Sequence, residues 1–275
     1  MEKKSAAKSD ISSVRLVRLR NGEKPKRCVD KVAREEPLEI RVRGRSVAVT
    51  MRTPGHDEEL AAGFLFTERV IRERKHLVGI SGCRASFEPE NTLNVFLRSG
   101  VDVDFARLTR HVFATSSCGL CGKASIEAVK QQLPPVTSSM TITSRVLQEL
   151  PTRMKSAQRT FAKTGGLHAA AVIDSTGKLV VLREDIGRHN AVDKVIGYGF
   201  LKNELPFKSH ILLVSGRASF EIMQKALAAR IPIVCAVSAP SSLAVEFARE
   251  SGQTLVGFLR DKGMNLYCHG ERVVA

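Results

Sequence analysis

Two cysteines two residues apart, in Cys118-Gly119-Leu120-Cys121, are the side chains with the clearest chemical potential in this sequence. At this spacing both sulfur atoms can reach one metal ion or each other. The pair lies in a stretch of small residues ahead of a predicted helix over 124–132, and a helix N-terminus stabilises a thiolate. Lys123 adds positive charge nearby. The pattern therefore predicts a nucleophilic thiolate that could act as a persulfide carrier, a redox dithiol or part of a zinc site.

The remaining sequence disfavours zinc. A structural zinc ion needs two more ligands, yet there is no second CxxC and no His-x₃₋₅-His pair. Zinc deaminases require His-x-Glu before the cysteines, whereas His168-Ala169-Ala170 lacks the Glu and follows them. The other cysteines are isolated: Cys28, Cys83, Cys235 and Cys268. We expect no metal site, and spacing alone leaves the dithiol and the persulfide carrier open.

A dense polar segment begins directly after an apolar strand and runs Arg183-Glu184-Asp185-Ile186-Gly187-Arg188-His189-Asn190-Ala191-Val192-Asp193-Lys194. The carboxyl end of a strand that opens into a helix is the usual ligand crevice of open α/β sheets. Arg188 and the first N–H groups of the helix from Asn190 could hold phosphate. The competing interpretation is a capped helix with ordinary surface ion pairs.

Two later strands end in a similar way. Ser215-Gly216-Arg217-Ala218-Ser219 follows one strand, and Ser238-Ala239-Pro240-Ser241-Ser242 follows the next. Arg217 can bind phosphate through two N–H groups, and the glycine allows close approach of the backbone. Each group alone is a weak signal, since small polar residues also cap helices. Three such groups along one sheet edge predict a shared crevice, to which Ser215 and Arg217 would contribute.

Two further candidates lie near predicted turns. The basic segment Phe258-Leu259-Arg260-Asp261-Lys262-Gly263 stands between two predicted strands and would suit a diphosphate, although a plain hairpin is a serious alternative. His168 follows Gly165-Gly166, a tight turn or a close backbone approach. A single histidine at a strand start is more often structural, so His168 is only a candidate.

The elements that position these residues follow two patterns. Residues 35–135 predict an α+β unit, with strands over 38–42 and 47–51 around Arg43-Gly44-Arg45, a helix from Glu58, and strands over 77–80 and 93–97. Pro134-Pro135 is the predicted boundary. Residues 136–275 form the second unit, and residues 1–34 a basic, loosely ordered tail with one edge strand over 14–19.

The second unit predicts a helical stretch over 144–163 with a break at Pro151, and then a regular alternation. Predicted strands cover 169–173, 179–182, 211–215, 231–237, 254–259 and 265–268, and predicted helices cover 190–201, 220–229 and 242–250. Short apolar strands alternating with helices indicate an α/β fold with a mostly parallel or mixed sheet covered on both faces.

Composition narrows the function classes. The chain has 275 residues and a formal net charge of +15, which favours anionic partners. Aromatic residues are scarce and no recognition motif for nucleic acid is visible, so charge alone supports a nucleic-acid binder. No apolar run reaches the ~18 residues that cross a membrane, and the N-terminus lacks the pattern of a secretory signal. We expect a cytoplasmic protein without a membrane partner.

Several motifs together resemble the FdhD family of formate dehydrogenase accessory proteins. They are Glu36-Pro37-Leu38-Glu39-Ile40, Arg52-Thr53-Pro54-Gly55, Glu58-Glu59-Leu60-Ala61-Ala62-Gly63-Phe64-Leu65, Ser117-Cys118-Gly119-Leu120-Cys121-Gly122, Thr164-Gly165-Gly166-Leu167-His168-Ala169-Ala170, Asp185-Ile186-Gly187-Arg188-His189-Asn190-Ala191-Val192-Asp193-Lys194 and Ser215-Gly216-Arg217. The resemblance covers residues 35 to 268 and excludes the basic tail.

The resemblance implies a sulfur carrier, or sulfurtransferase. Such a protein takes sulfane sulfur from a cysteine desulfurase as a persulfide and passes it to the molybdenum or tungsten bis-guanine-dinucleotide cofactor of formate dehydrogenase. It also implies a homodimer and a cytidine-deaminase-like, three-layer C-terminal domain. Cys118 and Cys121 match the persulfide positions, with Cys118 favoured, and Phe258 to Gly263 match the cofactor turn, where Lys262 is the basic residue. The alternative is a chaperone that binds the cofactor without sulfur chemistry.

Overall fold

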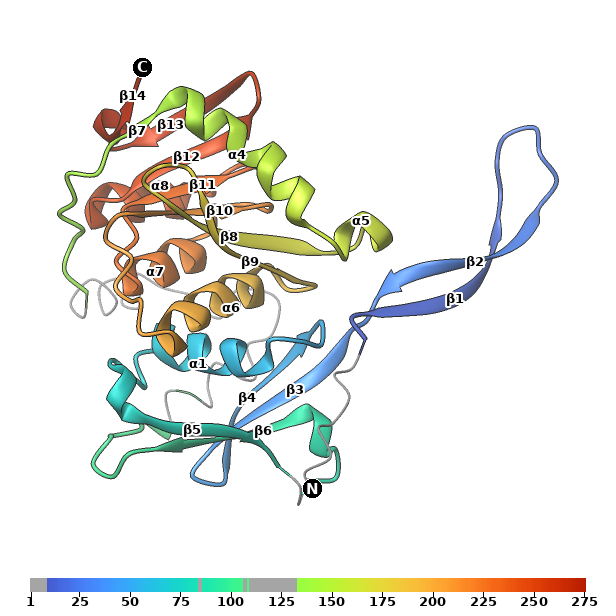
Figure 1. Ribbon diagram of the computed structural model, residues 1–275, viewed down its shortest axis with the longest axis horizontal. Helices are drawn as coiled ribbons and strands as arrows, with labels where there is room; N and C mark the ends of the chain where they lie inside the picture. Colours follow the sequence, from blue (N-terminus) through green and yellow to red (C-terminus); the bar gives the residue numbers. More distant parts are fainter. Residues whose placement is uncertain (1–8, 84–85, 106–107, 109–132) are drawn as a thin grey trace.

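The computed structural model describes residues 9–83, 86–105, 108 and 133–275 (Figure 1). The cysteine loop and the helix predicted over 124–132 lie outside the described residues, and so do Cys118 and Cys121. The described chain is a mixed α/β protein with a large sheet in its C-terminal part, a smaller sheet in its N-terminal part and helices between them (Figure 1).

The large sheet has six strands in the order β13-β12-β11-β10-β8-β9. The central strands β10, β11 and β12 are parallel, whereas β8, β9 and β13 each run antiparallel to their neighbours. The strands are β8 (His168–Asp174), β9 (Leu179–Asp185), β10 (His210–Val214), β11 (Ile233–Ala236), β12 (Thr254–Arg260) and β13 (Gly263–Cys268). The prediction of a mixed sheet is confirmed.

Helices cover both faces of this sheet, as the apolar runs predicted (Figure 1). One face packs against α6 (Arg188–Leu201), α7 (Phe220–Ala228) and α8 (Ser242–Ser251), and the other against α4 (Ser144–Ala157). Successive strand residues point to opposite faces. Leu212 therefore joins the core under α6 to α8, while Leu213 joins the core under α4.

The predicted helix break at Pro151 is wrong, because α4 continues through this proline. Proline removes a backbone hydrogen bond and costs roughly 3 kcal/mol inside a helix. The apolar residues Leu147, Leu150 and Met154 share one face of α4 and are buried against the large sheet. Burial of three large side chains stabilises the helix by more than the proline destabilises it.

The smaller sheet has the order β4-β3-β6-β5 and forms the N-terminal unit. Its strands are β3 (Glu36–Val42), β4 (Arg45–Arg52), β5 (Leu77–Gly82) and β6 (Thr92–Leu97). The β3–β4 hairpin turns at Arg43 and Gly44, whose φ angles are 51° and 76°. Two positive φ angles are what a two-residue hairpin turn requires, so the predicted hairpin is confirmed. The 3₁₀ turns η1 (Arg74–His76) and η2 (Pro89–Asn91) precede β5 and β6.

Helix α1 (Asp57–Thr67) joins the two units, because it lies between the smaller sheet and α6 (Figure 1). The two helices cross at Gly63 of α1 and Gly197 of α6. A Cβ atom at Gly63 would lie 1.8 Å from the carbonyl oxygen of Asp193, and one at Gly197 would lie 1.8 Å from the carbonyl oxygen of Glu59. The helices are therefore in direct backbone contact.

Residues 11–33 are a two-stranded antiparallel hairpin where we expected a loosely ordered tail with one edge strand. Strand β1 (Ile11–Arg18) pairs with β2 (Lys26–Ala33) along its whole length, and the hairpin projects from the body of the molecule (Figure 1). The weak alternation of apolar residues in this basic segment concealed the second strand. We refer to residues 11–33 as the arm.

The segment after the predicted boundary is fixed on the C-terminal unit. The Val136 amide donates to the Ser251 carbonyl at 2.8 Å, and the Arg230 guanidinium donates to the carbonyls of Pro134 and Pro135. The remaining elements are β7 (Ile142–Thr143), α5 (Phe161–Thr164), η3 (Gly270–Arg272) and β14 (Val273–Val274). None of the helices in the described ranges is both long enough and apolar enough to span a membrane.

Candidate functional site

The topology of the large sheet brings the predicted polar segments to one edge. Strands β9, β10, β11 and β12 all end there, and β8 begins there because it runs antiparallel to β9 and β10. At a strand spacing of ~4.8 Å, the end of β9 lies about 19 Å from the end of β12. We call the candidate residues at this edge the sheet-edge cluster. They are His168, Arg188, His189, Ser215, Arg217, Ser219 and the β12–β13 turn from Phe258 to Gly263.

Gly216 lets two of these side chains approach the end of β10. A Cβ atom at Gly216 would lie 3.3 Å from Nδ1 of His168 and 3.8 Å from Cδ of Arg188. The Nε atom of Arg188 is buried and has no hydrogen-bond partner in the described part of the chain. A buried donor without an acceptor costs about 1–3 kcal/mol, and more when the group is charged. An anion bound beside Arg188 would supply the missing acceptor.

His189 forms a second polar group at the start of α6. Its Nε2 atom lies 3.3 Å from the Ser219 hydroxyl and 3.8 Å from the Glu221 carboxylate. Burial acts to raise the pKa of Glu221, but the Ser219 hydroxyl, a backbone amide and nearby cations outweigh it and leave that pKa lowered. These contacts tie the N-terminus of α6, which follows β9, to that of α7, which follows β10, across the start of β8.

The surroundings of both histidines of the cluster lower their pKa values and so favour the neutral imidazole. Burial lowers the pKa of His168, and the charge of Arg188 lowers it further. Burial and the positive charges of Lys225 and Arg188 lower the pKa of His189 to about 4. The positive charge at this edge therefore comes mainly from arginine and lysine, and a neutral imidazole can accept as well as donate a hydrogen bond.

The remaining candidates of the cluster differ in what they can offer a ligand. Arg217 is exposed and has no side-chain partner among the residues with described positions. The Ser215 hydroxyl accepts a hydrogen bond from the Ala169 amide at 2.9 Å, so it also holds β8 to β10. Neither residue belongs to the packed core, and both lie at the carboxyl end of β10.

The β12–β13 turn is a hairpin, and its side chains point in different directions. Leu259 is fully buried in the core beneath α4, so its side chain cannot contact a ligand at the surface. Arg260 donates to the Val237 carbonyl, and Asp261 accepts from the Thr152 hydroxyl at 3.0 Å. Lys262 is exposed. Phe258 is 43% exposed with φ 51°, and Gly263 begins β13.

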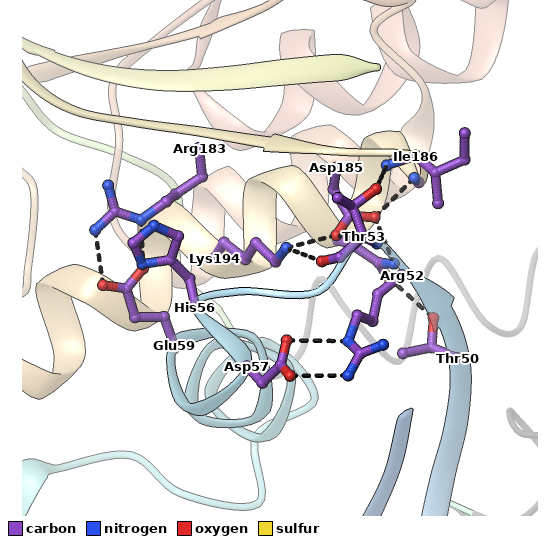
Figure 2. Close-up of polar contacts among 12 residues, drawn as sticks. Thr50, Arg52, Thr53, His56, Asp57, Glu59, Arg183, Asp185, Ile186 and Lys194 are labelled. Carbon is purple, nitrogen blue, oxygen red and sulfur yellow. Dashed lines mark hydrogen bonds and ion pairs between the residues drawn. The ribbon is translucent and has the colours of Figure 1, made fainter. Parts of the chain in front are cut away.

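Much of the dense polar segment after β9 is structural, contrary to the ligand interpretation (Figure 2). Asp185 is fully buried and forms an ion pair with the buried Lys194 at 2.7 Å. Asp185 also accepts from the Thr53 amide at 3.2 Å, and Lys194 donates to the Thr53 carbonyl at 2.9 Å. Asn190 donates to the Met51 carbonyl at 2.8 Å. These groups bind the end of β4 to α6 instead of facing solvent.

A second set of charged side chains joins α1 to the C-terminal unit through one part-buried ion pair and one buried ion pair that bonds Thr67. Arg183 makes a two-point contact with Glu59, at 2.5 and 2.7 Å, which Figure 2 shows beside α1. Lys225 donates to Asp193 at 2.8 Å and to the Thr67 hydroxyl at 3.0 Å. We therefore assign Arg183 and Asp193 to the packing between the units, which leaves Arg188 and His189 as the candidates for ligand contact.

The structural roles of two residues, Arg52 and Thr53, were missed by the sequence analysis. Arg52 is only 1% exposed and holds Asp57 through two hydrogen bonds, of 3.0 and 2.9 Å (Figure 2). Thr53 is the partner of the buried pair described above. The only available signal was their adjacency in an Arg-Thr-Pro-Gly turn, which does not identify partners distant in the sequence.

The described cysteines are poor candidates for sulfur chemistry. Cys235 is fully buried, and burial strongly raises the pKa of its thiol. Burial also raises the pKa of Cys268. Cys83 is buried as well, and Cys28 lies half-buried in the arm. Within the described ranges, no group of three or more His, Cys, Asp or Glu side chains is arranged to hold a metal ion.

Fold and site together define a mixed α/β protein in which a six-stranded sheet presents a cation-lined edge. The family model for the FdhD/NarQ family matches residues 33–274. The chain belongs to the FdhD/NarQ family.

Curated relatives agree with this assignment. A protein of Streptomyces coelicolor named sulfur carrier protein FdhD is 50% identical over 270 residues, which is 94% of each chain. A protein of Mycolicibacterium paratuberculosis with the same name is 51% identical over 245 residues, or 87% of this chain and 90% of the relative. The similarity therefore extends over nearly the whole molecule.

A solved structure shows the same fold. A crystal structure from Desulfotalea psychrophila, described as that of a formate dehydrogenase accessory protein, superposes with a TM-score of 0.77. The sequences are 24% identical, and the match covers 97% of this chain and 100% of the other. The mixed α/β class expected from the sequence is confirmed.

Proposed function

We propose that the protein is a cytoplasmic sulfur carrier that accepts sulfane sulfur from a cysteine desulfurase and delivers it to the molybdenum or tungsten bis-guanine-dinucleotide cofactor of formate dehydrogenase. The observation that carries this proposal is the 50% identity, over 94% of the chain, to a protein named sulfur carrier protein FdhD. The function is thereby carried over from a relative of nearly equal length.

The sheet-edge cluster supports binding of the cofactor. A bis-dinucleotide carries several phosphate groups, and guanidinium groups bind phosphate through paired hydrogen bonds. Arg188 presents a buried donor that lacks a partner in the described structure, and Arg217 and Lys262 are exposed at the same edge. The edge spans about 19 Å from β9 to β12 at the usual strand spacing, so these cations are distributed along it. The protein would therefore hold the cofactor along this edge.

Sulfur would be carried on Cys118 or Cys121, both of which lie outside the described residues. The thiolate of the carrier attacks the terminal sulfur of the donor persulfide. One S–S bond forms, the donor's S–S bond breaks, and the donor leaves as a thiolate, so the transfer needs no external oxidant. Burial raises the thiol pKa values of Cys235 and Cys268, which makes these two less reactive. Cys83 is buried as well, so the CxxC pair and Cys28 are the thiols to compare in the experiment below.

The partners proposed for this function are a cysteine desulfurase, formate dehydrogenase and a second copy of the chain. The formal charge of +15 would draw the anionic cofactor toward the protein at low salt. No permanently bound metal is needed for the transfer, because the cofactor brings its own metal as cargo.

The experiment loads the protein with a cysteine desulfurase and cysteine, followed by intact-mass spectrometry. The wild-type chain is expected to gain about 32 Da per bound sulfur, and Cys118→Ser or Cys121→Ser should abolish or halve the gain. Cys28→Ser serves as the matched control. Cys28 is a half-buried free cysteine in the arm, outside the CxxC motif, so its replacement should leave the mass gain unchanged. Retention of the full mass gain in the variant with both CxxC cysteines replaced would refute the proposal.

The alternative function is that of a chaperone that binds the cofactor without sulfur chemistry. The variant with both CxxC cysteines replaced distinguishes this function from that of a sulfur carrier. A chaperone would still bind the cofactor and still support maturation of formate dehydrogenase without either thiol. A sulfur carrier would bind the cofactor but leave the enzyme inactive.

A further inference from the structure

The arm is a structural appendage with few contacts to the rest of the described chain. Its two strands form a sheet of their own, so neither outer edge pairs with another described strand. Its base is held where Asp10, the residue before the arm, accepts from the Thr160 hydroxyl. The bond from the Arg34 amide to the Asp10 carbonyl, at 2.9 Å, closes the hairpin itself. Figure 1 shows the rest of the arm projecting from the body.

A hairpin of this kind needs a partner surface. An isolated two-stranded hairpin is at best marginally stable in water, and its unpaired edges favour strand addition. The arm nevertheless exposes several branched apolar side chains. Val17 and Val29 are 56% and 64% exposed, and Leu19 beyond the first strand is 71% exposed. Exposed apolar side chains gathered on one projecting element indicate a protein interaction site.

One face of the arm combines these valines with positive charge. Arg15 is opposite Val29 in the hairpin register, Val17 is opposite Arg27, and Ser13 is opposite Lys31. Residues directly opposite each other point to the same face, so this face alternates cations with valines. Arg15, Arg27 and Lys31 are all exposed. We call Arg15, Val17, Arg27, Val29 and Lys31 the cationic face.

The charge of the arm indicates an acidic partner. Residues 11–33 contain seven Lys or Arg and only two acidic residues, in a chain whose formal net charge is +15. Pairing of two such arms, one from each of two copies, would bring like charges together. An acidic protein surface complements both the charge and the apolar side chains.

The base of the arm lies next to the sheet-edge cluster. Ala33, the last residue of β2, is within 3.9 Å of the position that a Cβ atom of Gly166 would occupy, and Gly166 stands two residues before His168. A protein held by the arm would therefore approach the edge where we place the cofactor. The match to the family model begins at residue 33, so all of the arm except Ala33 precedes the matched segment.

We propose that the arm is a docking element for an acidic surface of the enzyme that receives the cofactor. This surface contacts the cationic face, and a strand of the enzyme pairs with an edge of the hairpin. This inference rests on the proposed function for the identity of the recipient. It assigns to the arm the task of holding the recipient beside the sheet-edge cluster during delivery.

The test measures binding of the full-length protein to the apo-formate dehydrogenase encoded by the same genome, by biolayer interferometry at about 0.1 M salt, where surface charges still act over ~10 Å. The variant Arg15→Glu/Arg27→Glu/Lys31→Glu should weaken binding about tenfold or more, mainly through slower association. Higher salt should weaken the wild-type complex and leave the variant nearly unchanged.

A matched control carries Lys178→Glu, Lys202→Glu and Lys208→Glu. These three lysines are exposed on the body, and their ammonium groups make no ion pair with another described residue. The control changes the net charge by the same amount as the arm variant. If the arm itself is the docking element, the control should bind the apo-enzyme with an affinity within about threefold of the wild type. A second arm variant, Val17→Thr/Val29→Thr, keeps the β-branched shape and the charge, and should weaken binding about fivefold or more.

Several outcomes would overturn the inference. The arm variants could bind the apo-enzyme as tightly as the wild type, or the wild type could fail to bind it at all. The charge-reversed arm could change only the sedimentation coefficient, which would show that the arm holds a second copy. It could also lose binding to duplex DNA alone, which would make the arm a nucleic-acid element. Persulfide loading is measured on the same variants, so failure of docking is distinguishable from failure of the sulfur-carrier proposal.

Discussion

Replacing Gly197 by alanine tests the packing that joins the two units of this protein. Gly197 of α6 meets α1 at a point where the two backbones touch. A Cβ atom there would lie 1.8 Å from the Glu59 carbonyl oxygen, 2.7 Å from its carbonyl carbon and 2.8 Å from the Gly63 amide nitrogen. Since all three atoms belong to helix backbone, no side-chain rotation can relieve the overlap.

The size of the effect follows from two opposing contributions. The carbonyl oxygen must move by at least about 1.2 Å before the contact becomes tolerable, which places the cost at the upper end of overpacking, about 3 kcal/mol. Alanine is better than glycine in a helix by roughly 1 kcal/mol. The net destabilisation is therefore about 2 kcal/mol. For a chain of this size, each kcal/mol lowers the melting temperature by roughly 2–4 °C, so we expect a decrease of about 4–8 °C.

Differential scanning calorimetry on the wild type, Gly197→Ala and a matched glycine variant measures this difference. Gly79 is the control, because it has no positive φ and nothing lies within 4 Å of the position of its Cβ. Gly79→Ala should change the melting temperature by no more than about 2 °C. If Gly197→Ala melts at or above the wild-type temperature, then α1 and α6 do not touch through their backbones, and our account of how the units are joined is wrong.

Three further predictions concern buried charge, pH and anion binding. Lys194→Met leaves the fully buried Asp185 carboxylate without its cation. The free energy of unfolding, measured with urea, should decrease by about 3–5 kcal/mol, and a decrease below about 1 kcal/mol would contradict the ion-pair geometry. The pKa of His189 in the folded protein is about 4, below its ordinary 6.5, so the unfolded chain binds this proton more tightly. Stability should therefore fall as the pH drops from 6.5 toward 4, and His189→Gln should flatten that slope in pH-dependent unfolding; an unchanged slope would assign it to other groups. GDP is a probe for one guanine nucleotide of the cofactor. Arg188→Ala should weaken its binding by about 10–100-fold in isothermal titration calorimetry, because a hydrogen bond to a charged group contributes about 1.5–3 kcal/mol. Equal affinities of the variant and the wild type would show that Arg188 does not bind the nucleotide.

The order and type of most described elements could be predicted from the sequence, because hydrophobic periodicity is a local property. The β3–β4 hairpin was predicted from alternation and from the Arg43-Gly44 turn, and the alternation after residue 167 indicated the large mixed sheet. The prediction failed at Pro151 and in the arm. At Pro151 the burial of neighbouring side chains against a sheet distant in the sequence outweighs a local preference. In the arm the weak alternation did not reveal the second strand.

The candidate site was predicted only in part. The strand-end rule predicted that Arg188 and Arg217 lie at one edge of the sheet, and the structure places both there. The same rule also selected Asp185 and Lys194, which bind each other and Thr53 in the interior. The same types of polar residue bind ligands at the surface and bind distant segments of the chain in the interior. The sequence pattern therefore could not distinguish these two roles.

By itself the sequence determined the residue chemistry and the local structure: a CxxC pair, a basic excess, and strands and helices whose ends carry arginine and small polar residues. The tertiary structure alone decided which of those charges face solvent and which are buried between the two units. The reason is physical, since the free energy of a charged side chain depends on whether water or a specific partner surrounds it. Thr53 and Asp185 are far apart in the chain, and only the folded backbone brings them into contact.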